Sequence, residues 1–287
     1  MLLPKHNQIF IGAIVVFATL MIGMNRTLLN DVPKHISGKE FSSQNAGIQA
    51  TTIQQTEESP VPVGDTAGYL WNGIDIYRNA AIGFKPVTDK VTDHTYQIMY
   101  GRFLLPYYHQ IPTMKMLEIG LGCNMNYGPG ASVALHKKLF PQAELWEAEY
   151  DAACVEKHRD GTLKGINLLT GDQGDDTVLD GWIEQSGGKF DVVIDDGGHH
   201  NCQIWHSFQK LWPTVKPGGL YFIEDMHVAK LEEYRGATTE TCGKDLIVPE
   251  KLKEYMDDLI YDTKRKTDVE FIFCQSEACV LGKKKVS

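Results

Sequence analysis

The sequence predicts an α/β protein with a doubly wound, mostly parallel sheet and a terminal antiparallel hairpin, preceded by a membrane helix and a flexible stem. Apolar stretches of strand length alternate with stretches of helix length between residues 115 and 226, which is typical of strand–helix–strand units. Two strand-like stretches then follow each other directly near the C-terminus. An uncharged run near the N-terminus is separated from all of this by a polar segment.

The uncharged run extends from Ile9 to Met24. A membrane helix needs roughly 20 apolar residues, or somewhat fewer in a thin bilayer. We therefore predict that residues 1–26 form an uncleaved signal-anchor, with a cleaved signal peptide and a core or interfacial helix as alternatives. A short tail before a large domain favours a single-pass protein of the secretory pathway, in the endoplasmic reticulum or Golgi, with the domain in the lumen.

Residues 27–65 are rich in Ser, Thr, Gln, Gly and Pro and lack the apolar density of a core. This composition predicts a flexible stem. The folded domain is expected over residues 66–287, beginning with a helical lead-in at 66–113 that covers one edge of the sheet. Aromatic side chains recur in the lead-in at mixed helical spacing, and we expect them to serve packing.

Turn residues divide the rest into elements. Pro141 and Gly161 end the first two helices after the lead-in, and a Pro-Gly-Gly sequence at 217–219 ends the fourth. Parallel strands joined by helices require right-handed crossovers, so helices should cover both faces of the sheet. We expect strands at 115–122, 143–151, 165–175, 189–198 and 220–226, helices at 128–141, 151–161, 176–188 and 201–219, and a hairpin at 268–284.

The polar clusters of the sequence stand at the carboxyl ends of these strands, where ligands bind in such sheets. Gly120 and Gly122 follow the first strand and would let the backbone approach a ligand closely. A dinucleotide-binding loop would carry a third glycine or an alanine where Met125 stands, so a nicotinamide cofactor is disfavoured.

The next two strands end in groups that suit a nucleoside. Glu149 could accept both hydroxyls of a ribose, and Asp172 with Gln173 could read the edge of a base. Helix capping is the competing interpretation for the acidic residues here, and Asp151 and Asp175 suit it best.

Charge and cysteine content narrow the classes of partner. The formal net charge of −9 argues against nucleic acid, because phosphate binding needs a basic face. The six cysteines include no CxxC pair, which disfavours a zinc site. In a luminal domain some would form disulfides, and Cys242 with Cys274 or Cys279 is the expected pair.

The motifs together resemble a known family. "LEIGLG", "EAE", "GDQGD" and a strand closing in "DD" resemble the Rossmann-like class I S-adenosylmethionine-dependent methyltransferases. "IDDGGHH", followed by "FQKLWPTVKPGGLYFIEDMH", is similar to the macrocin and mycinamicin sugar O-methyltransferase family, within the cephalosporin-hydroxylase-like group. The resemblance covers Met116 to Met226 and the terminal hairpin.

The resemblance implies an S-adenosylmethionine cofactor and a divalent cation, Mg²⁺ or Mn²⁺, held by Asp196, Glu224 and Asp225. It also implies His199 as the general base, three residues after the first metal ligand; the adjacent His200 leaves that assignment open. The residues expected at the cofactor are Glu118, Gly120, Gly122, Glu149, Asp172, Gln173 and Asp195.

We therefore expect an O-methyltransferase that acts on a hydroxyl of a small molecule or glycan. A hydroxyl bound to a cation has a lowered pKa, and a neutral imidazole can take its proton. A luminal glycosyltransferase and a non-catalytic S-adenosylmethionine-binding protein are the alternatives, and binding of a nucleotide-sugar would favour the first. A homo-oligomer is left open.

Overall fold

The computed structural model describes residues 66–235, 242, 245–261 and 267–285. These residues belong to one unit of the chain, Pro60–Ser287. The expected signal-anchor at 1–26 and the stem at 27–65 lie outside the described residues. Among the helices that the structure does describe, none is long and apolar enough to cross a bilayer.

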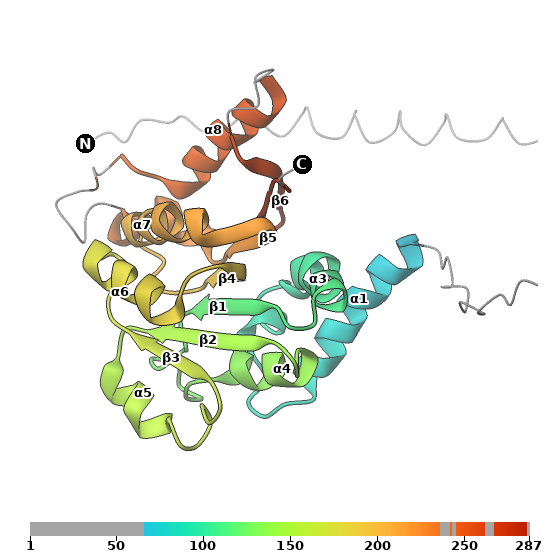
Figure 1. Ribbon diagram of the computed structural model, residues 1–287, viewed down its shortest axis with the longest axis vertical. Helices are drawn as coiled ribbons and strands as arrows, with labels where there is room; N and C mark the ends of the chain where they lie inside the picture. Colours follow the sequence, from blue (N-terminus) through green and yellow to red (C-terminus); the bar gives the residue numbers. More distant parts are fainter. Residues whose placement is uncertain (1–65, 236–241, 243–244, 262–266, 286–287) are drawn as a thin grey trace, which may run out of the picture. The chain divides into compact units, whose positions relative to one another are not determined.

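The core of the domain is a seven-stranded sheet in the order β3-β2-β1-β4-β5-β7-β6 (Figure 1). The first five strands of the chain pair in parallel, and β7 pairs antiparallel with both β5 and β6. The expected mostly parallel sheet with a terminal hairpin is therefore confirmed. The strands are β1 (Lys115–Ile119), β2 (Glu144–Glu149), β3 (Asn167–Thr170), β4 (Phe190–Asp195), β5 (Val215–Ile223), β6 (Val269–Cys274) and β7 (Cys279–Lys283).

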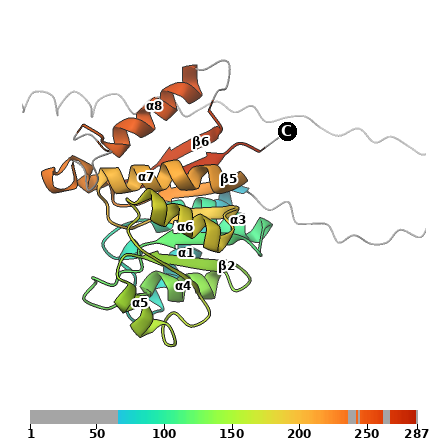
Figure 2. The same ribbon diagram turned by 60° about the vertical axis from the view of Figure 1, so that its left-hand side comes forward.

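Helices cover both faces of the sheet, as the strand–helix alternation requires. On one face α1, α3 and α4 gather together (Figure 1), and on the other α6, α7 and α8 lie side by side (Figure 2). Because helices cover it on both faces, the central strand β4 is buried along its whole length. The helices are α1 (Thr66–Ile82), α2 (Gln97–Met99), α3 (Leu105–Gln110), α4 (Ala131–Leu139), α5 (Ala152–His158), α6 (Asp176–Ser186), α7 (Asn201–Leu211) and α8 (Val248–Tyr261), with a π-helical turn η2 (Tyr100–Leu104) and short 3₁₀ turns including η1 (Asp89–Val91).

Aspartates fix where two of these helices begin. Asp151 accepts hydrogen bonds from the backbone N–H groups of Ala153 and Cys154, both at 3.0 Å, at the start of α5. Asp175 accepts one from Thr177 at 2.7 Å at the start of α6. These are N-caps, so the capping interpretation is correct for both aspartates.

The lead-in packs on a face of the sheet, where the sequence suggested an edge. Its side chains Tyr77, Tyr100 and Leu104 are fully buried in one cluster with Val192 and Phe222 of the central strands. Packing is thus a role of the lead-in aromatics, as expected. The lead-in packs on this face because the alternate side chains of β1, β4 and β5 that point to it are apolar. Packing removes these side chains from water.

Two elements depart from expectation. Strand β5 already begins at Val215, so the Pro-Gly-Gly sequence that was expected to close a helix lies within the strand, next to a register shift against β4. Helix α8 was not anticipated, although Pro249 stands in its first turn, where proline favours the start of a helix.

All six cysteines form disulfides, in pairs different from the expected one. Cys274 and Cys279 face each other across the β6–β7 hairpin and bond to each other, so neither is available to Cys242. Cys242 instead bonds to Cys202 at the start of α7, and the third pair is Cys123–Cys154.

Candidate active site

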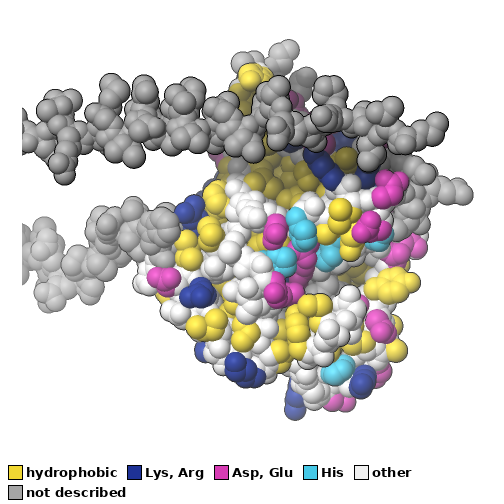
Figure 3. Space-filling view, turned by 180° about the vertical axis from the view of Figure 1, so that it is seen from behind, with side chains coloured by type: hydrophobic (Ala, Val, Ile, Leu, Met, Phe, Trp, Pro, Cys, Tyr) yellow, Lys and Arg dark blue, Asp and Glu magenta, His cyan; other side chains and the backbone are white. Residues whose placement is uncertain are grey.

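A cavity of about 930 Å³ opens at the carboxyl ends of the parallel strands. We distinguish two parts. The glycine end lies over β1 to β3 and includes residues 120–123, 149–151 and 171–173; the acidic end lies over β4 and β5 and includes residues 196–200 and Asp225. On the face shown in Figure 3, carboxylate and imidazole side chains lie beside each other near the centre.

At the glycine end, the backbone itself requires glycine. Gly120 has φ +101°, and a Cβ atom there would lie 1.9 Å from the backbone oxygen of Asp196. Gly122 also has a positive φ, +78°. Only glycine adopts these conformations readily. The loop after β1 therefore runs close against the end of β4, with no side chains between the backbone and a ligand at these two positions.

Glu149 is fixed at the rim of this end. Its Oε2 accepts a hydrogen bond from the backbone N–H of Leu121 at 3.1 Å, and its Oε1 accepts one from Asp151 at 3.0 Å. A carboxylate has about four lone-pair positions, so these two bonds leave acceptor capacity for ligand hydroxyls. The prediction for Glu149 is compatible with this geometry.

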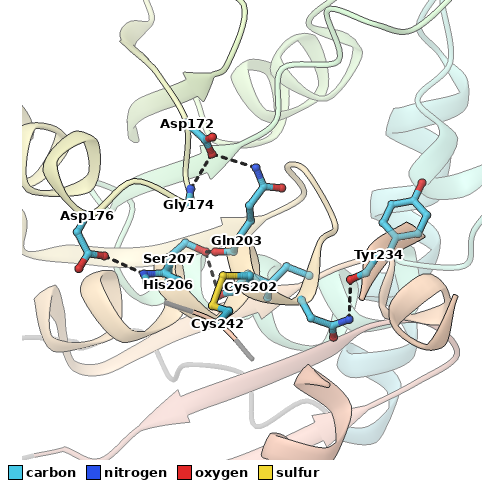
Figure 4. The surroundings of a disulfide bond; sticks show 11 residues. Asp172, Gly174, Asp176, Cys202, Gln203, His206, Ser207, Tyr234 and Cys242 are labelled. Atoms are coloured by element: carbon cyan, nitrogen blue, oxygen red, sulfur yellow. Dashed lines mark hydrogen bonds and ion pairs between the residues drawn. A yellow bond between two sulfur atoms is a disulfide. The ribbon is translucent and has the colours of Figure 1, made fainter. Parts of the chain in front are cut away.

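Asp172 lines the cavity, and its Oδ1 accepts hydrogen bonds from the backbone of Gly174 at 2.8 Å and from Gln203 at 2.9 Å (Figure 4). The Gln173 amide is used within the protein instead. It donates to Asp195 at 2.9 Å and accepts from the Gly198 backbone N–H at 2.9 Å. Gln173 therefore braces the loop after β4, a role that its position in the sequence did not indicate.

Two residues expected at the cofactor do not line the cavity. Asp195 is buried and accepts hydrogen bonds from Gln173, Ser207 and Tyr221. Glu118 is also buried, since side chains alternate along a strand and its own points to the face that the lead-in covers. The structure therefore does not bring either side chain to this cavity, and their contact with the cofactor stays a prediction.

At the acidic end, Asp196, His199 and Asp225 each offer a ligand atom, and these atoms lie within 4.8 Å of one another. The His199 Nε2 atom is 3.4 Å from the Asp225 Oδ2 atom. Both of these residues have left-handed backbone conformations, with φ +57° and +53°. Such conformations are uncommon outside glycine and cluster at functional sites. His200 points elsewhere, with its ring against Tyr234 at 5.2 Å.

The third expected metal ligand, Glu224, is not part of this group. It is buried, and its Oε2 accepts a hydrogen bond from Lys90 at 2.7 Å while its Oε1 accepts one from the Tyr100 hydroxyl. The structure thus brings Asp196 and Asp225 together with His199, and holds Glu224 by groups from the lead-in.

Lys90 is a residue that the sequence did not reveal. It lies in η1, is buried, and places its ammonium 2.6 Å from Asp196 Oδ2 and 3.2 Å from Glu118 Oε1 in addition to Glu224. A lysine in a lead-in without motifs gives no signal of this kind, because the two carboxylates that accept its hydrogen bonds are more than 100 positions away. Tyr96 was likewise assigned to packing alone, yet its hydroxyl donates to Asp225 Oδ1 at 2.5 Å.

These buried charges shift one another's pKa. Burial would lower the pKa of Lys90, but Asp196 and Glu224 raise it well above its usual range, so the ammonium stays charged. Burial raises the pKa of Asp196 to about 6, against the attraction of Lys90. Burial would also raise the pKa of Glu118, but Lys90 and His136 lower it to about 2. At neutral pH Asp196 is therefore ionised and able to bind a cation.

Two disulfides stand beside the cavity. Cys123–Cys154 joins the loop after β1 to α5, and Cys123 itself lines the cavity. Cys202–Cys242 is at the start of α7, directly after the loop that carries His199, and is shown with its surroundings in Figure 4. Both ends of the cavity therefore have a covalent link next to a loop that forms their walls.

Comparison with known proteins points to methyl transfer. The chain is 38% identical over 153 residues to mycinamicin VI 2''-O-methyltransferase of Micromonospora griseorubida, a match that covers 52% of this chain and 36% of that protein. It is 31% identical over 169 residues to demethylmacrocin O-methyltransferase of Streptomyces fradiae, covering 58% of this chain and 40% of that protein. The chain spans about two fifths of the length of these curated relatives. No protein-family model matches it.

A solved structure agrees with the sequence comparison. The MycE methyltransferase of the mycinamycin pathway, determined with magnesium, S-adenosylhomocysteine and mycinamycin VI, matches with a TM-score of 0.54 at 27% identity, covering 76% of this chain and 55% of that one. The two comparisons thus agree, since both the sequence and the fold of this chain are similar to those of methyltransferases. Over about half of its length the chain is similar in sequence to the macrocin and mycinamicin O-methyltransferases, and it has the fold of the class I S-adenosylmethionine-dependent methyltransferases.

Proposed function

We propose that this protein is an S-adenosylmethionine-dependent, divalent-cation-assisted O-methyltransferase that acts on a sugar or glycan hydroxyl. The observation that carries the proposal is a single cavity with two chemically different ends. One end has bare backbone and a fixed carboxylate, and the other has two carboxylates beside an imidazole. Methyl transfer requires neighbouring binding sites for the methyl donor and the hydroxyl acceptor, and the two ends of the cavity would provide them.

The glycine end suits the cofactor, which would supply the methyl group. Gly120 and Gly122 allow close approach to the backbone, Glu149 can accept the ribose hydroxyls, and Asp172 can bind the base. The charge of the cavity also suits the positively charged sulfonium of S-adenosylmethionine. Its lining includes several carboxylates, and its one lysine, Lys90, is already paired with buried carboxylates.

The acidic end suits a hard cation, because carboxylate oxygens are the ligands that Mg²⁺ and Mn²⁺ prefer. Asp196 and Asp225 would hold it. Lys90 binds only Oδ2 of Asp196, and among the described residues no hydrogen bond reaches its Oδ1. A cation here would lower the pKa of an acceptor hydroxyl.

His199 would take the acceptor's proton at Nε2. Asp225 faces that nitrogen at 3.4 Å and would stabilise the imidazolium once the proton is transferred. The remaining contribution of the chain is to hold the acceptor oxygen in line with the methyl group. The names of two relatives describe O-methylation of a rhamnosyl tetracenomycin and of an olivosyl oleandolide, which supports a sugar or glycan as the acceptor here.

Calorimetry on the full chain tests the proposal. S-adenosylhomocysteine should bind with or without Mg²⁺, and a panel of glycosides should then be screened for methyl transfer from S-adenosylmethionine. Absence of S-adenosylhomocysteine binding would reject the proposal. Saturable binding of a nucleotide-sugar in its place would favour a glycosyltransferase, and binding without transfer to any hydroxyl would favour a non-catalytic protein.

We also propose that residues 1–26 anchor the chain in the membrane and that residues 27–65 separate the anchor from a luminal domain, 66–287. The pairing of all six cysteines supports this, because disulfides persist in oxidising compartments. Protease protection of a tagged chain in sealed microsomes is the test. A protected domain is expected, and a domain that is digested without detergent would contradict the luminal orientation.

A further inference from the structure

Lys90 occupies the centre of a cage of carboxylates behind the acidic end. Its ammonium contacts Asp196 at 2.6 Å, Glu224 at 2.7 Å and Glu118 at 3.2 Å. An ammonium has three N–H donors, of which Asp196 and Glu224 accept two, while Glu118 lies within ion-pair distance. The Lys90 side chain is 2% exposed, and a charge this deeply buried is stable only with such partners.

The adjacent residues Glu224 and Asp225 are used differently. Both oxygens of Glu224 are engaged, by Lys90 and by the Tyr100 hydroxyl, and its side chain is 1% exposed. Asp225 lines the cavity, is 18% exposed, and directs Oδ2 toward His199. The backbone accounts for the divergence, since the left-handed conformation of Asp225 turns the chain sharply after the end of β5.

We propose that Lys90 is a positioning residue that acts as an internal cation: it takes Glu224 out of the metal's ligand set, so that a divalent cation is held by Asp196 and Asp225 beside His199. The inference rests on the proposed function and changes the ligand set that the family resemblance implies. Lys90 contacts only one oxygen of Asp196. It therefore orients this carboxylate and leaves the other oxygen available to the divalent cation.

The lead-in thereby becomes part of the site. Lys90 and Tyr100 hold Glu224, and Tyr96 holds Asp225. Without the ammonium, the buried carboxylates of Glu118 and Glu224 and the partly exposed carboxylate of Asp196 would have no lysine between them. A divalent ion could then replace the ammonium, because carboxylates that close together attract a counter-ion strongly.

Titration of the full chain with Mn²⁺, followed by the electron paramagnetic resonance signal of the free ion, tests this directly. Glu224→Gln and Asp225→Asn are matched variants, since each turns one carboxylate at the same strand end into an amide. Each variant removes one carboxylate and keeps the size of the side chain, so the two Mn²⁺ affinities can be compared directly. We expect E224Q to weaken Mn²⁺ binding by less than about fivefold, and D225N by at least about tenfold more than E224Q.

Lys90→Met provides the second arm. Glu224 is then released, so K90M should bind Mn²⁺ more tightly than wild type or bind a second ion, and E224Q should weaken binding far more in the K90M background than alone. If Lys90 only supports the structure and does not act as an internal cation, K90M should simply bind Mn²⁺ more weakly than wild type. If K90M does not fold, as judged by circular dichroism, the E224Q and D225N pair still decides.

The inference is overturned if E224Q loses as much Mn²⁺ affinity as D225N, because Glu224 is then a ligand. Failure of the proposed function gives a different result. Wild type that binds S-adenosylhomocysteine but no Mn²⁺ removes the cation from the function and this inference with it, whereas wild type that binds neither rejects the methyltransferase proposal itself.

Discussion

The two ends of the cavity are held in place by contacts of different range. At the glycine end, Glu149 binds the backbone of Leu121, 28 positions away, and Asp172 binds Gly174. At the acidic end, Lys90 reaches Asp196 across 106 positions and Tyr96 reaches Asp225 across 129. The glycine end therefore follows from neighbouring strand ends, while the acidic end needs the lead-in docked on the sheet. Variants at the glycine end should therefore change cofactor binding, and variants at the acidic end should change cation binding and turnover.

The largest expected effect is at the acidic end. His199→Ala should lower methyl transfer by at least about 100-fold, because general base catalysis contributes that much or more. The affinity for S-adenosylhomocysteine, measured by calorimetry, should not change, since His199 does not belong to the glycine end. His200→Ala is the matched control and should retain most of the turnover. The opposite outcome, with H200A inactive and H199A active, would move the base to His200.

A change at Gly120 should damage both ends at once, because its backbone meets that of Asp196. Gly120→Ala places a Cβ 1.9 Å from the Asp196 oxygen and forces a strained φ. We expect the free energy of unfolding to fall by about 2–3 kcal/mol in chemical denaturation. Gly128→Ala is the control: it shares a positive φ, +86°, but its Cβ meets nothing within 4 Å. Equal losses in the two variants would show that the contact with Asp196 does not matter.

Glu149→Gln should affect the glycine end alone. An amide keeps one acceptor oxygen of the two that bind Leu121 and Asp151, and loses the charge-assisted bonds to ligand hydroxyls. The Kd for S-adenosylhomocysteine should rise about tenfold, with Mn²⁺ affinity unchanged. Asp151→Asn removes the same charge two positions away and keeps the helix cap, so it should bind S-adenosylhomocysteine nearly as wild type does. Loss of Mn²⁺ binding in E149Q would contradict the independence of the ends.

A smaller effect is expected from the Cys123–Cys154 disulfide. The double variant C123S/C154S frees a loop that lines the glycine end. Reordering it on binding should weaken S-adenosylhomocysteine affinity about two- to tenfold. The variant C274S/C279S removes the hairpin disulfide, whose cysteines do not line the cavity, and should not change that affinity. An unchanged Kd for C123S/C154S would show that the loop is ordered without its covalent link.

The smallest effect concerns His94, which joins the lead-in to the terminal hairpin through Glu277 at 2.6 Å. Burial would lower the pKa of His94, but the bond to Glu277 and the charge of Asp225 raise it above its usual value of 6.5. Its stabilising contribution is therefore fully present below pH 6.5 and is lost as the pH rises through the raised value. The difference in Tm between wild type and His94→Gln should be greatest near pH 6 and shrink by pH 8.5. A constant difference would mean that His94 is not charged in this bond.

The site shows how far sequence reasoning reaches. Gly120, Gly122, Glu149 and Asp172 stand at strand ends, and strand ends can be read from apolar length and turn residues, so these residues were placed at the cavity correctly. Asp195 and Glu118 were not. Both are acidic residues within the sequence motifs. The side of the sheet to which each side chain points, however, depends on strand register and on which helices cover that side.

Between residues 115 and 226, the sequence by itself determined the order of strands and helices, the glycine turns and the edge of the sheet at which polar groups meet. These follow from local periodicity and from the rule that parallel strands end together. Only the tertiary structure decided the cysteine pairs, the burial of Glu224 and the ammonium of Lys90 between carboxylates. Apart from the Cys274–Cys279 pair, whose members are 5 positions apart, those features depend on contacts between segments about 30 to 130 positions apart. No local sequence pattern indicates which distant side chains will meet.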